Sequence, residues 1–183
     1  MGRDGGVTMN IADDPVVAAL NEVVRSDSTA AVMGTTLQRV LRQLDASAKL
    51  MAWETIPLSA FADGLPENIR SCWIFVIRAG AATGAERHPN SHQRSFSLIG
   101  GGTFELRAGI SWHSHPLTST DRASVEQRWV SIPPSTWHRL FVGSEAWGML
   151  SFHTVAPEAL IEERPVDTND LEGRTRQEPY ILS

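Results

Sequence analysis

The residues best suited to chemistry are two histidines and a glutamate in the strand-like part of the chain. Glu86 and His88 are separated by one residue, and His138 follows a proline-rich turn. Residues two apart in a strand point to the same side, so the Glu86 and His88 side chains can converge. Imidazole and carboxylate ligands suit Fe(II), Mn(II), Ni(II) or Zn(II) and leave positions open for a substrate. We therefore expect Glu86, His88 and His138 to hold one divalent transition metal.

Further residues are candidates for lining the same centre. His92 is a fourth candidate metal ligand, provided that a turn at Asn90 and Ser91 brings its side chain round. The candidates for contacts with a bound substrate are Gln93, Trp137, His153, His113 and His115. A core position for His153, and an incidental surface position for the pair His113 and His115, stay open as alternatives.

Two stretches of the chain resemble the signature motifs of the cupin superfamily. The better match is Ile132-Pro133-Pro134-Ser135-Thr136-Trp137-His138, which resembles the second motif, Pro-x-Gly-x-x-His. In this stretch Pro133, Ser135 and His138 keep the spacing of the family, and Ser135 replaces the glycine. By this resemblance, His138 is one metal ligand.

The stretch that begins at Gly80 resembles the first motif in its spacing rather than in its residues. If the motif closes at Gly100, Glu86 and His88 take the two histidine positions and Gln93 takes the glutamate position. If it closes at Gly101, the ligand pair becomes His88 and Asn90, and Arg94 takes the glutamate position. Both registers stay open, and neither supplies the complete ligand set of the family.

The resemblance covers residues 72–155 and implies a fold and a function. The expected fold is all-β, a cupin-type jelly-roll barrel, here with an N-terminal pair of α-helices. The expected function is that of a metal-binding, oxygenase-like enzyme, of the metal-dependent dioxygenase kind, acting on a small organic substrate in the barrel cavity. Because the first motif is incomplete, the alternative is a metal-free cupin that binds a small ligand as a sensor or storage module. The resemblance also implies a homodimer.

Composition excludes several other classes of protein. The chain has 183 residues with 16 Lys and Arg against 21 Asp and Glu, so its net charge is −5. Nucleic acids and anionic membranes favour basic proteins, so neither is an expected partner. Cys72 is the only cysteine, which excludes an intrachain disulfide and a zinc site with several thiolates. The apolar runs are too short to span a membrane, and we expect a cytoplasmic protein.

The elements that must position these residues change in character along the chain. Asp14-Pro15 predicts the start of an amphipathic helix, and a second helix is expected from about Ser28, giving a helical arm over 1–50. Short β-branched and aromatic runs then predict a barrel over 51–156. The strand-like runs are 72–79, 92–99, 103–108, 128–133, 136–142 and 146–155. The polar residues 157–183 are expected to form a surface arm, or a segment that packs on a second subunit.

Overall fold

The computed structural model describes residues 11–179, apart from the side chains of residues 62, 63, 178 and 179. After a short turn, η1 (Ile11–Asp13), two helices follow, α1 (Pro15–Val24) and α2 (Asp27–Asp45). Asp14 caps α1 by accepting hydrogen bonds from its first backbone N–H groups, and Ser26 caps α2 in the same way. Both predicted helices are confirmed, and the second begins one residue before the expected Ser28.

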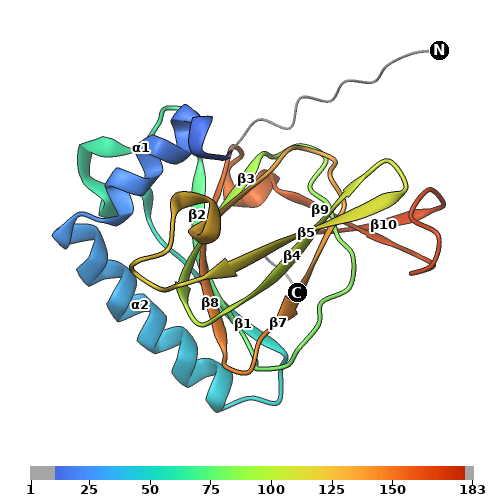
Figure 1. Cartoon of the computed structure of the whole chain (residues 1–183), viewed down its shortest axis with the longest axis horizontal. Helices are drawn as coiled ribbons and strands as arrows, with labels where there is room; N and C mark the ends of the chain where they lie inside the picture. Colours follow the sequence, from blue (N-terminus) through green and yellow to red (C-terminus); the bar gives the residue numbers. More distant parts are fainter. Residues whose placement is uncertain (1–10, 180–183) are drawn as a thin grey trace.

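Most of the remaining chain is antiparallel strand. The strands are β1 (Met51–Thr55), β2 (Ser71–Ile77), β3 (Gln93–Ile99), β4 (Gly101–Ala108), β5 (Ser111–Thr118), β6 (Trp129–Ile132), β7 (His138–Val142), β8 (Trp147–His153), β9 (Ile161–Pro165) and β10 (Thr175–Pro179). Short helical segments are η2 (Leu58–Gly64), α3 (Val125–Arg128) and η3 (Pro157–Ala159). The strands pair as one sheet of five, in the order β1-β2-β8-β3-β6, one of three, β5-β4-β7, and the hairpin β9-β10 (Figure 1).

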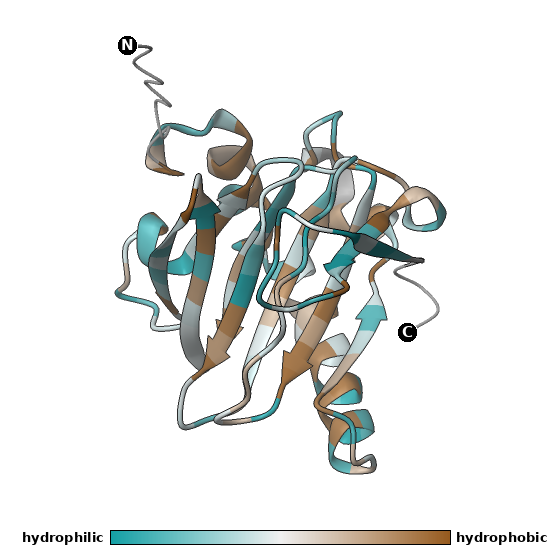
Figure 2. Cartoon of the chain, turned by 90° about the vertical axis from the view of Figure 1, so that its right-hand side faces the viewer, coloured by the Kyte–Doolittle hydropathy of each residue, from teal (hydrophilic) through white to brown (hydrophobic). Residues whose placement is uncertain are grey.

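The two larger sheets face each other across an apolar core. Side chains alternate between the two faces of each strand, as the alternating apolar and polar bands in Figure 2 show. Phe75 and Met149 of the five-stranded sheet pack in one cluster with Phe104 and Leu140 of the three-stranded sheet. This cluster fills one end of the space between the sheets, and the other end is occupied by polar residues that include His138 and His153.

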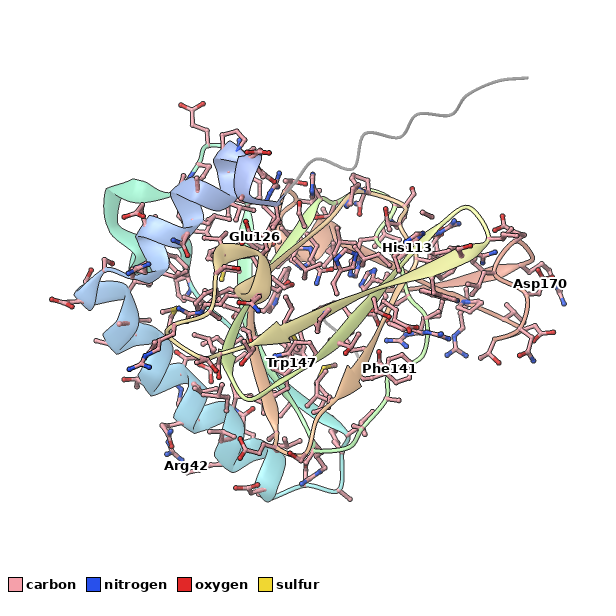
Figure 3. The ribbon with its side chains drawn as sticks, in the orientation of Figure 1. Arg42, His113, Glu126, Phe141, Trp147 and Asp170 are labelled. Carbon is pink, nitrogen blue, oxygen red and sulfur yellow. The ribbon has the colours of Figure 1, made fainter. Side chains whose placement is uncertain are left out.

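The two helices cover the outer face of the five-stranded sheet (Figure 1). Their apolar stripes, represented by Leu20, Leu37 and Val40, pack on Ile74 and Phe152 of the sheet. The opposite side of α2 is exposed, and Arg42 points away from the body (Figure 3). A second apolar core therefore lies between helices and sheet, and it uses the stripes that the sequence predicts.

The predicted all-β jelly-roll with its N-terminal helices is confirmed, but the predicted closure into a barrel is not seen. Within residues 11–179 the strands form separate sheets and do not close into one hydrogen-bonded barrel. The edge beside β7 is joined to residues 82 and 86 only by isolated bridges, Ala82 to Phe141 and Glu86 to His138. The segment that faces β7 contains Gly84, and Pro89 follows it. Glycine weakens a strand and proline cannot donate a ladder hydrogen bond, so pairing there stays short.

The polar segment after residue 157 forms the hairpin β9-β10, which packs on the body of the protein. Arg87 and Glu163 exchange backbone hydrogen bonds, and the carbonyl of Ile161 lies 3.1 Å from Nδ1 of His88. Glu162 and Glu163 are buried. This segment is thus part of the wall around the polar interior. Among the described residues, no helix is long and apolar enough to span a membrane.

Candidate metal centre

Glu86 and His138 lie side by side because their backbones are bonded to each other. The N–H of Glu86 donates to the carbonyl of His138 at 2.9 Å, and the N–H of His138 donates to the carbonyl of Glu86 at 2.8 Å. His88 lies two residues further along the same segment. Its carbonyl accepts a hydrogen bond from the N–H of Ser135, which ties the segment to the turn before β7. These bonds bring the three predicted ligands together.

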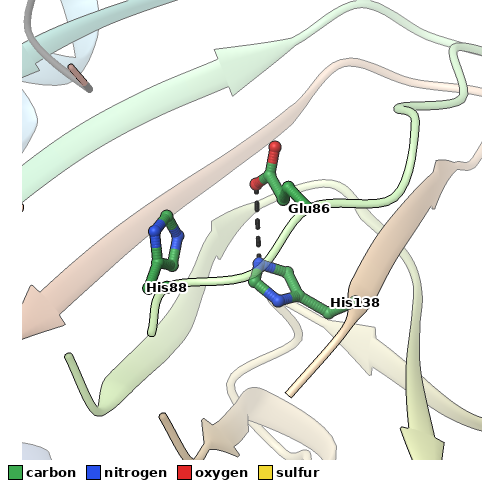
Figure 4. A group of neighbouring side chains, drawn as sticks. All are labelled: Glu86, His88 and His138. Atoms are coloured by element: carbon green, nitrogen blue, oxygen red, sulfur yellow. Dashed lines mark ion pairs between the residues drawn. The ribbon is translucent and has the colours of Figure 1, made fainter. Parts of the chain in front are cut away.

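The three side chains converge on one point between the sheets (Figure 4). One potential ligand atom from each of Glu86, His88 and His138 lies within 4.8 Å of the others. Nε2 of His138 is 3.5 Å from Oε1 of Glu86, and the two imidazole rings have centroids 5.4 Å apart. Ligand atoms about 2.1 Å from a shared ion lie roughly 3 to 3.5 Å apart, so the closest pair already has suitable spacing.

The orientation of the two imidazoles is set by backbone carbonyls. Nδ1 of His88 lies 3.1 Å from the carbonyl oxygen of Ile161, and Nδ1 of His138 lies 3.1 Å from that of Thr136. A carbonyl oxygen can only accept, so Nδ1 carries the proton in each ring. In the neutral ring Nε2 then presents a lone pair, which is the arrangement that metal-binding histidines adopt.

The contact between His138 and Glu86 therefore requires a positive charge. Nε2 of His138 is buried and makes no hydrogen bond within the described part of the chain. Its neighbour, Oε1 of Glu86, is an acceptor as well. Two buried lone pairs at this distance repel each other unless a cation, either a metal ion or a proton on Nε2, lies between them. The donor set of two imidazoles and one carboxylate fits a divalent transition metal.

Glu86 is held in its ionised form by its surroundings. Burial raises its pKa, but the close contact with His138, reinforced by attraction to Arg164 and His88, outweighs burial and lowers the pKa to about 2. Nη2 of Arg164 bonds the second carboxylate oxygen, Oε2, at 2.5 Å. One oxygen of Glu86 thus faces Arg164, and the other faces the histidines.

His88 and His153 are neutral at physiological pH. Burial, reinforced by the charge of His138, lowers the pKa of His88 to about 4 against the opposing attraction of Glu86. Burial, with the charges of His88 and His138, places the pKa of His153 well below its usual value. A neutral imidazole is the form that binds a metal, so protons do not compete strongly for His88 at neutral pH.

His153 and Gln93 line the polar interior beside the three converging residues. Nδ1 of His153 lies 3.2 Å from the hydroxyl of Ser91, and Nε2 lies 3.3 Å from that of Ser151. The amide nitrogen of Gln93 donates to the hydroxyl of Ser95, and its buried Oε1 has no hydrogen-bond partner among the described residues. Both therefore lie where a substrate contact was expected, although the nitrogens of His153 are engaged with hydroxyl groups.

His92 does not join the other predicted ligands, and this expectation is corrected. Its Nε2 lies 2.8 Å from the hydroxyl of Ser131, and Arg94 and Asp14 are its charged neighbours. Successive residues in a strand point to opposite faces, so His92 and Gln93 cannot both face the interior. The turn at Asn90 and Ser91 does not reverse this parity.

Of the other candidates for substrate contact, Trp137 points away from the interior, whereas His113 and His115 lie on the inner face of the three-stranded sheet. The guanidinium carbon of Arg87 lies over the ring of Trp137, 4.6 Å from the ring centre. Trp137 directly precedes His138, and its side chain points away from that of His138. His113 and His138 are the two register partners of Leu106 in the three-stranded sheet, so all three share its inner face. His115 pairs with the inward Phe104. His113 is exposed near the start of β5 (Figure 3) and lies on the open side of this face.

Arg164 contacts one of the candidate ligands, and the sequence does not predict this contact. It lies on β9, in a segment whose composition predicts a surface arm. Three consecutive charged residues, Glu162, Glu163 and Arg164, lie between Ile161 and Pro165, and this run is too polar to indicate a strand with a buried face. Its pairing with Glu86 is a long-range contact and has no local signal.

Comparisons with known proteins add information on the fold alone. No family model and no curated protein matches the sequence. The structure is similar to cupin-fold structures, among them CapF with the inhibitor 3-isopropenyl-tropolone (TM-score 0.48, 11% identity, 62% of this chain and 30% of that one). Others are oxalate oxidase in complex with glycolate (0.45, 12%, 60% and 53%) and the 11S globulin from Wrightia tinctoria (0.49, 13%, 64% and 28%). The chain thus spans about half or less of these proteins, and no activity is transferred from them.

Proposed function

We propose that this protein binds one divalent transition metal through Glu86, His88 and His138 and acts as an oxygenase-like enzyme on a small organic substrate. The observation that carries the proposal is the buried contact between Nε2 of His138 and Oε1 of Glu86, where two acceptors face each other at 3.5 Å. A metal ion satisfies both atoms at once. Fe(II), Mn(II), Ni(II) and Zn(II) all accept such a donor set.

The residues around the three ligands would each have a defined task. The bound metal would supply a Lewis acid with open positions for substrate oxygen atoms and O2. Arg164 fixes one oxygen of Glu86 and, after His138, helps to keep this carboxylate ionised. The carbonyls of Ile161 and Thr136 hold the two imidazole rings in the ligating tautomer. The amide oxygen of Gln93, which has no hydrogen-bond partner among residues 11–179, offers an acceptor to a substrate hydroxyl or amine.

The direct test is metal analysis of the purified protein and of matched variants. We expect about one equivalent of a transition metal in the wild-type protein and a loss of at least about tenfold in metal affinity in Glu86→Gln and His138→Gln. His92→Gln is the control, because it removes a histidine that lies outside the group. Metal content far below one equivalent after growth in supplemented medium, or equal affinity in all three variants, would refute the proposal.

A second candidate function is metal-free binding of a small ligand, without catalysis. The same contact favours it if a proton on Nε2 of His138 takes the place of the metal and pairs with Glu86. The two candidate functions predict different effects of added metal on the stability of the chelator-treated protein. Stabilisation against unfolding on addition of Mn(II) or Zn(II), lost in His138→Gln, supports the metal centre; no change with any of the four metals supports the metal-free reading.

A further inference from the structure

Two further histidines, outside the group of Glu86, His88 and His138, lie one residue apart on a single strand. His113 and His115 belong to β5, which is an edge strand of the three-stranded sheet. Residues two apart in a strand point to the same side, with Cα atoms about 7 Å apart. The two imidazoles therefore leave β5 side by side and in the same direction.

Both side chains lie on the inner face of the sheet, near its open edge. His113 is the register partner of Leu106, and His115 is the register partner of Phe104. Directly opposed residues of an antiparallel pair share a face, and Phe104 is fully buried in the core between the sheets. His113 is nevertheless exposed (Figure 3), and His115 is half-buried. The pair thus lies where the interior of the protein meets solvent.

Both imidazoles are available as ligands. Within residues 11–179 neither of them makes a hydrogen bond or an ion pair. The nitrogens of His153, by contrast, lie beside serine hydroxyls, and so does Nε2 of His92. Burial lowers the pKa of His115, and the charge of His113 lowers it further, which is the repulsion expected of neighbouring imidazoles.

The donor set of this pair differs from that of the proposed metal centre. Among the described residues, Glu86, His88 and His138 form the only group of three or more whose ligand atoms all lie within 4.8 Å of one another. His113 and His115 therefore offer two imidazoles and no carboxylate. Imidazole suits Ni(II), Cu(II) and Zn(II), whereas Mg(II) and Mn(II) favour oxygen ligands. Two ligands hold an ion more weakly than three, so an ion here would exchange with solvent.

We propose that His113 and His115 chelate a second divalent metal ion, of the class of Ni(II), Cu(II) and Zn(II), with water completing its coordination. His113 and His138 are both register partners of Leu106 on opposite sides of β4, so their Cα atoms lie two strand spacings, or about 10 Å, apart. The two sites share no ligand. The proposal therefore does not rest on the proposed function, and each can fail without the other.

The test is isothermal titration of the full-length, chelator-treated protein with Ni(II). If both rings hold the same ion, His113→Gln and His115→Gln should each weaken Ni(II) binding at this site at least about tenfold. The double variant should then bind about as weakly as either single variant, because the chelate is already lost. His92→Gln is the matched control, since it removes a histidine that lies outside both groups, and should change the affinity less than about twofold.

His138→Gln separates this site from the proposed metal centre. If both sites exist, the wild-type protein binds about two equivalents of Ni(II), and His138→Gln retains the site that His113→Gln weakens. If the proposed function is wrong, the wild-type protein binds about one equivalent, and His113→Gln weakens that one. Either result supports the site at His113 and His115.

Three results would overturn the proposal. They are Ni(II) binding that neither His113→Gln nor His115→Gln weakens, binding of a separate ion by each of the two histidines, and equal weakening in His92→Gln. His113 is exposed, so its substitution leaves the packing of the core in place. The comparison of His113→Gln with His92→Gln therefore stands even if His115→Gln does not fold.

Discussion

Ser135 shows how one residue departs from the motif that it occupies. It stands where the cupin motif has glycine, and its backbone has φ 63°, in the left-handed region. A side chain in this region costs about 1–2 kcal/mol. The N–H of Ser135 donates to the carbonyl of His88, so the turn positions a proposed ligand despite this cost.

Ser135→Gly is therefore expected to stabilise the protein by roughly 0.5–1 kcal/mol, after allowance for the greater freedom of glycine in the unfolded chain. Chemical denaturation of the two proteins measures this difference. The control is Ser144→Gly, because Ser144 is also exposed and has no positive φ. That change should lower the free energy of unfolding, and a similar loss in Ser135→Gly would contradict the role assigned to strain.

At the scale of the element, one aspartate joins the first helix to the central sheet. Asp14 caps α1 with Oδ1, and its Oδ2 accepts from Nε of Arg94 on β3 at 3.0 Å. Both partners are almost completely buried. Burial raises the pKa of Asp14, but hydrogen bonding and attraction to Arg94, with the backbone donors of the cap, lower it overall.

Asp14→Ala is expected to lower the free energy of unfolding by about 3 kcal/mol or more. The variant loses the cap and also leaves the Arg94 guanidinium buried without its carboxylate. Ser26→Ala, which removes the cap of α2 alone, is the control and should cost about 1 kcal/mol. Equal losses in the two variants, measured by denaturant unfolding, would show that the ion pair contributes nothing.

The cap and the helix start were predictable from Asp14-Pro15, whereas the partner of Asp14 was not. Local sequence specifies which N–H groups lie within reach of a side chain three residues away. Arg94 occupies a position that one register of the first motif assigns to a metal ligand. Strand parity turns it to the helix-covered face instead, where Asp14 meets it.

At the scale of the whole molecule, buried neutral histidines make stability depend on pH. The pKa values of His88, at about 4, and of His153 lie below the ordinary 6.5. Below pH 6.5 the unfolded chain takes up protons at these positions and the folded chain does not. Stability is therefore full above this pH and falls as the pH drops, before the carboxylates titrate.

We expect each of these two histidines to cost about 1 kcal/mol of stability between pH 7.5 and 5.5 in chelator-treated protein. Denaturant unfolding at the two pH values measures this loss. His153→Gln removes one titrating group, so the difference between the two pH values should shrink by about 1 kcal/mol even if the variant is less stable overall. An unchanged difference would show that His153 titrates normally in the folded protein.

The homodimer implied by the cupin resemblance stays a prediction. The helical stripes are already buried on the sheet of the same chain, so they need no second copy to cover them. Exposed apolar side chains occur elsewhere, including Ile110 in the turn between β4 and β5 and Phe141 on β7, which Figure 3 labels. Sedimentation analysis of the full chain decides the oligomeric state.

The sequence by itself determined the parts of this protein that depend on near neighbours. The helix start at Asp14, most of the strands and the turn before His138 follow from local periodicity and from proline and glycine. It also placed Glu86 and His88 on one side, because residues two apart share a face.

Only the tertiary structure decided which distant groups meet. It brought Glu86 beside His138, turned His92 outward, and placed Arg164, from a segment of tail-like composition, on the carboxylate of Glu86. The reason is physical: backbone propensities act over a few residues, whereas these contacts depend on strand parity and sheet register, which are settled only when the apolar faces pack.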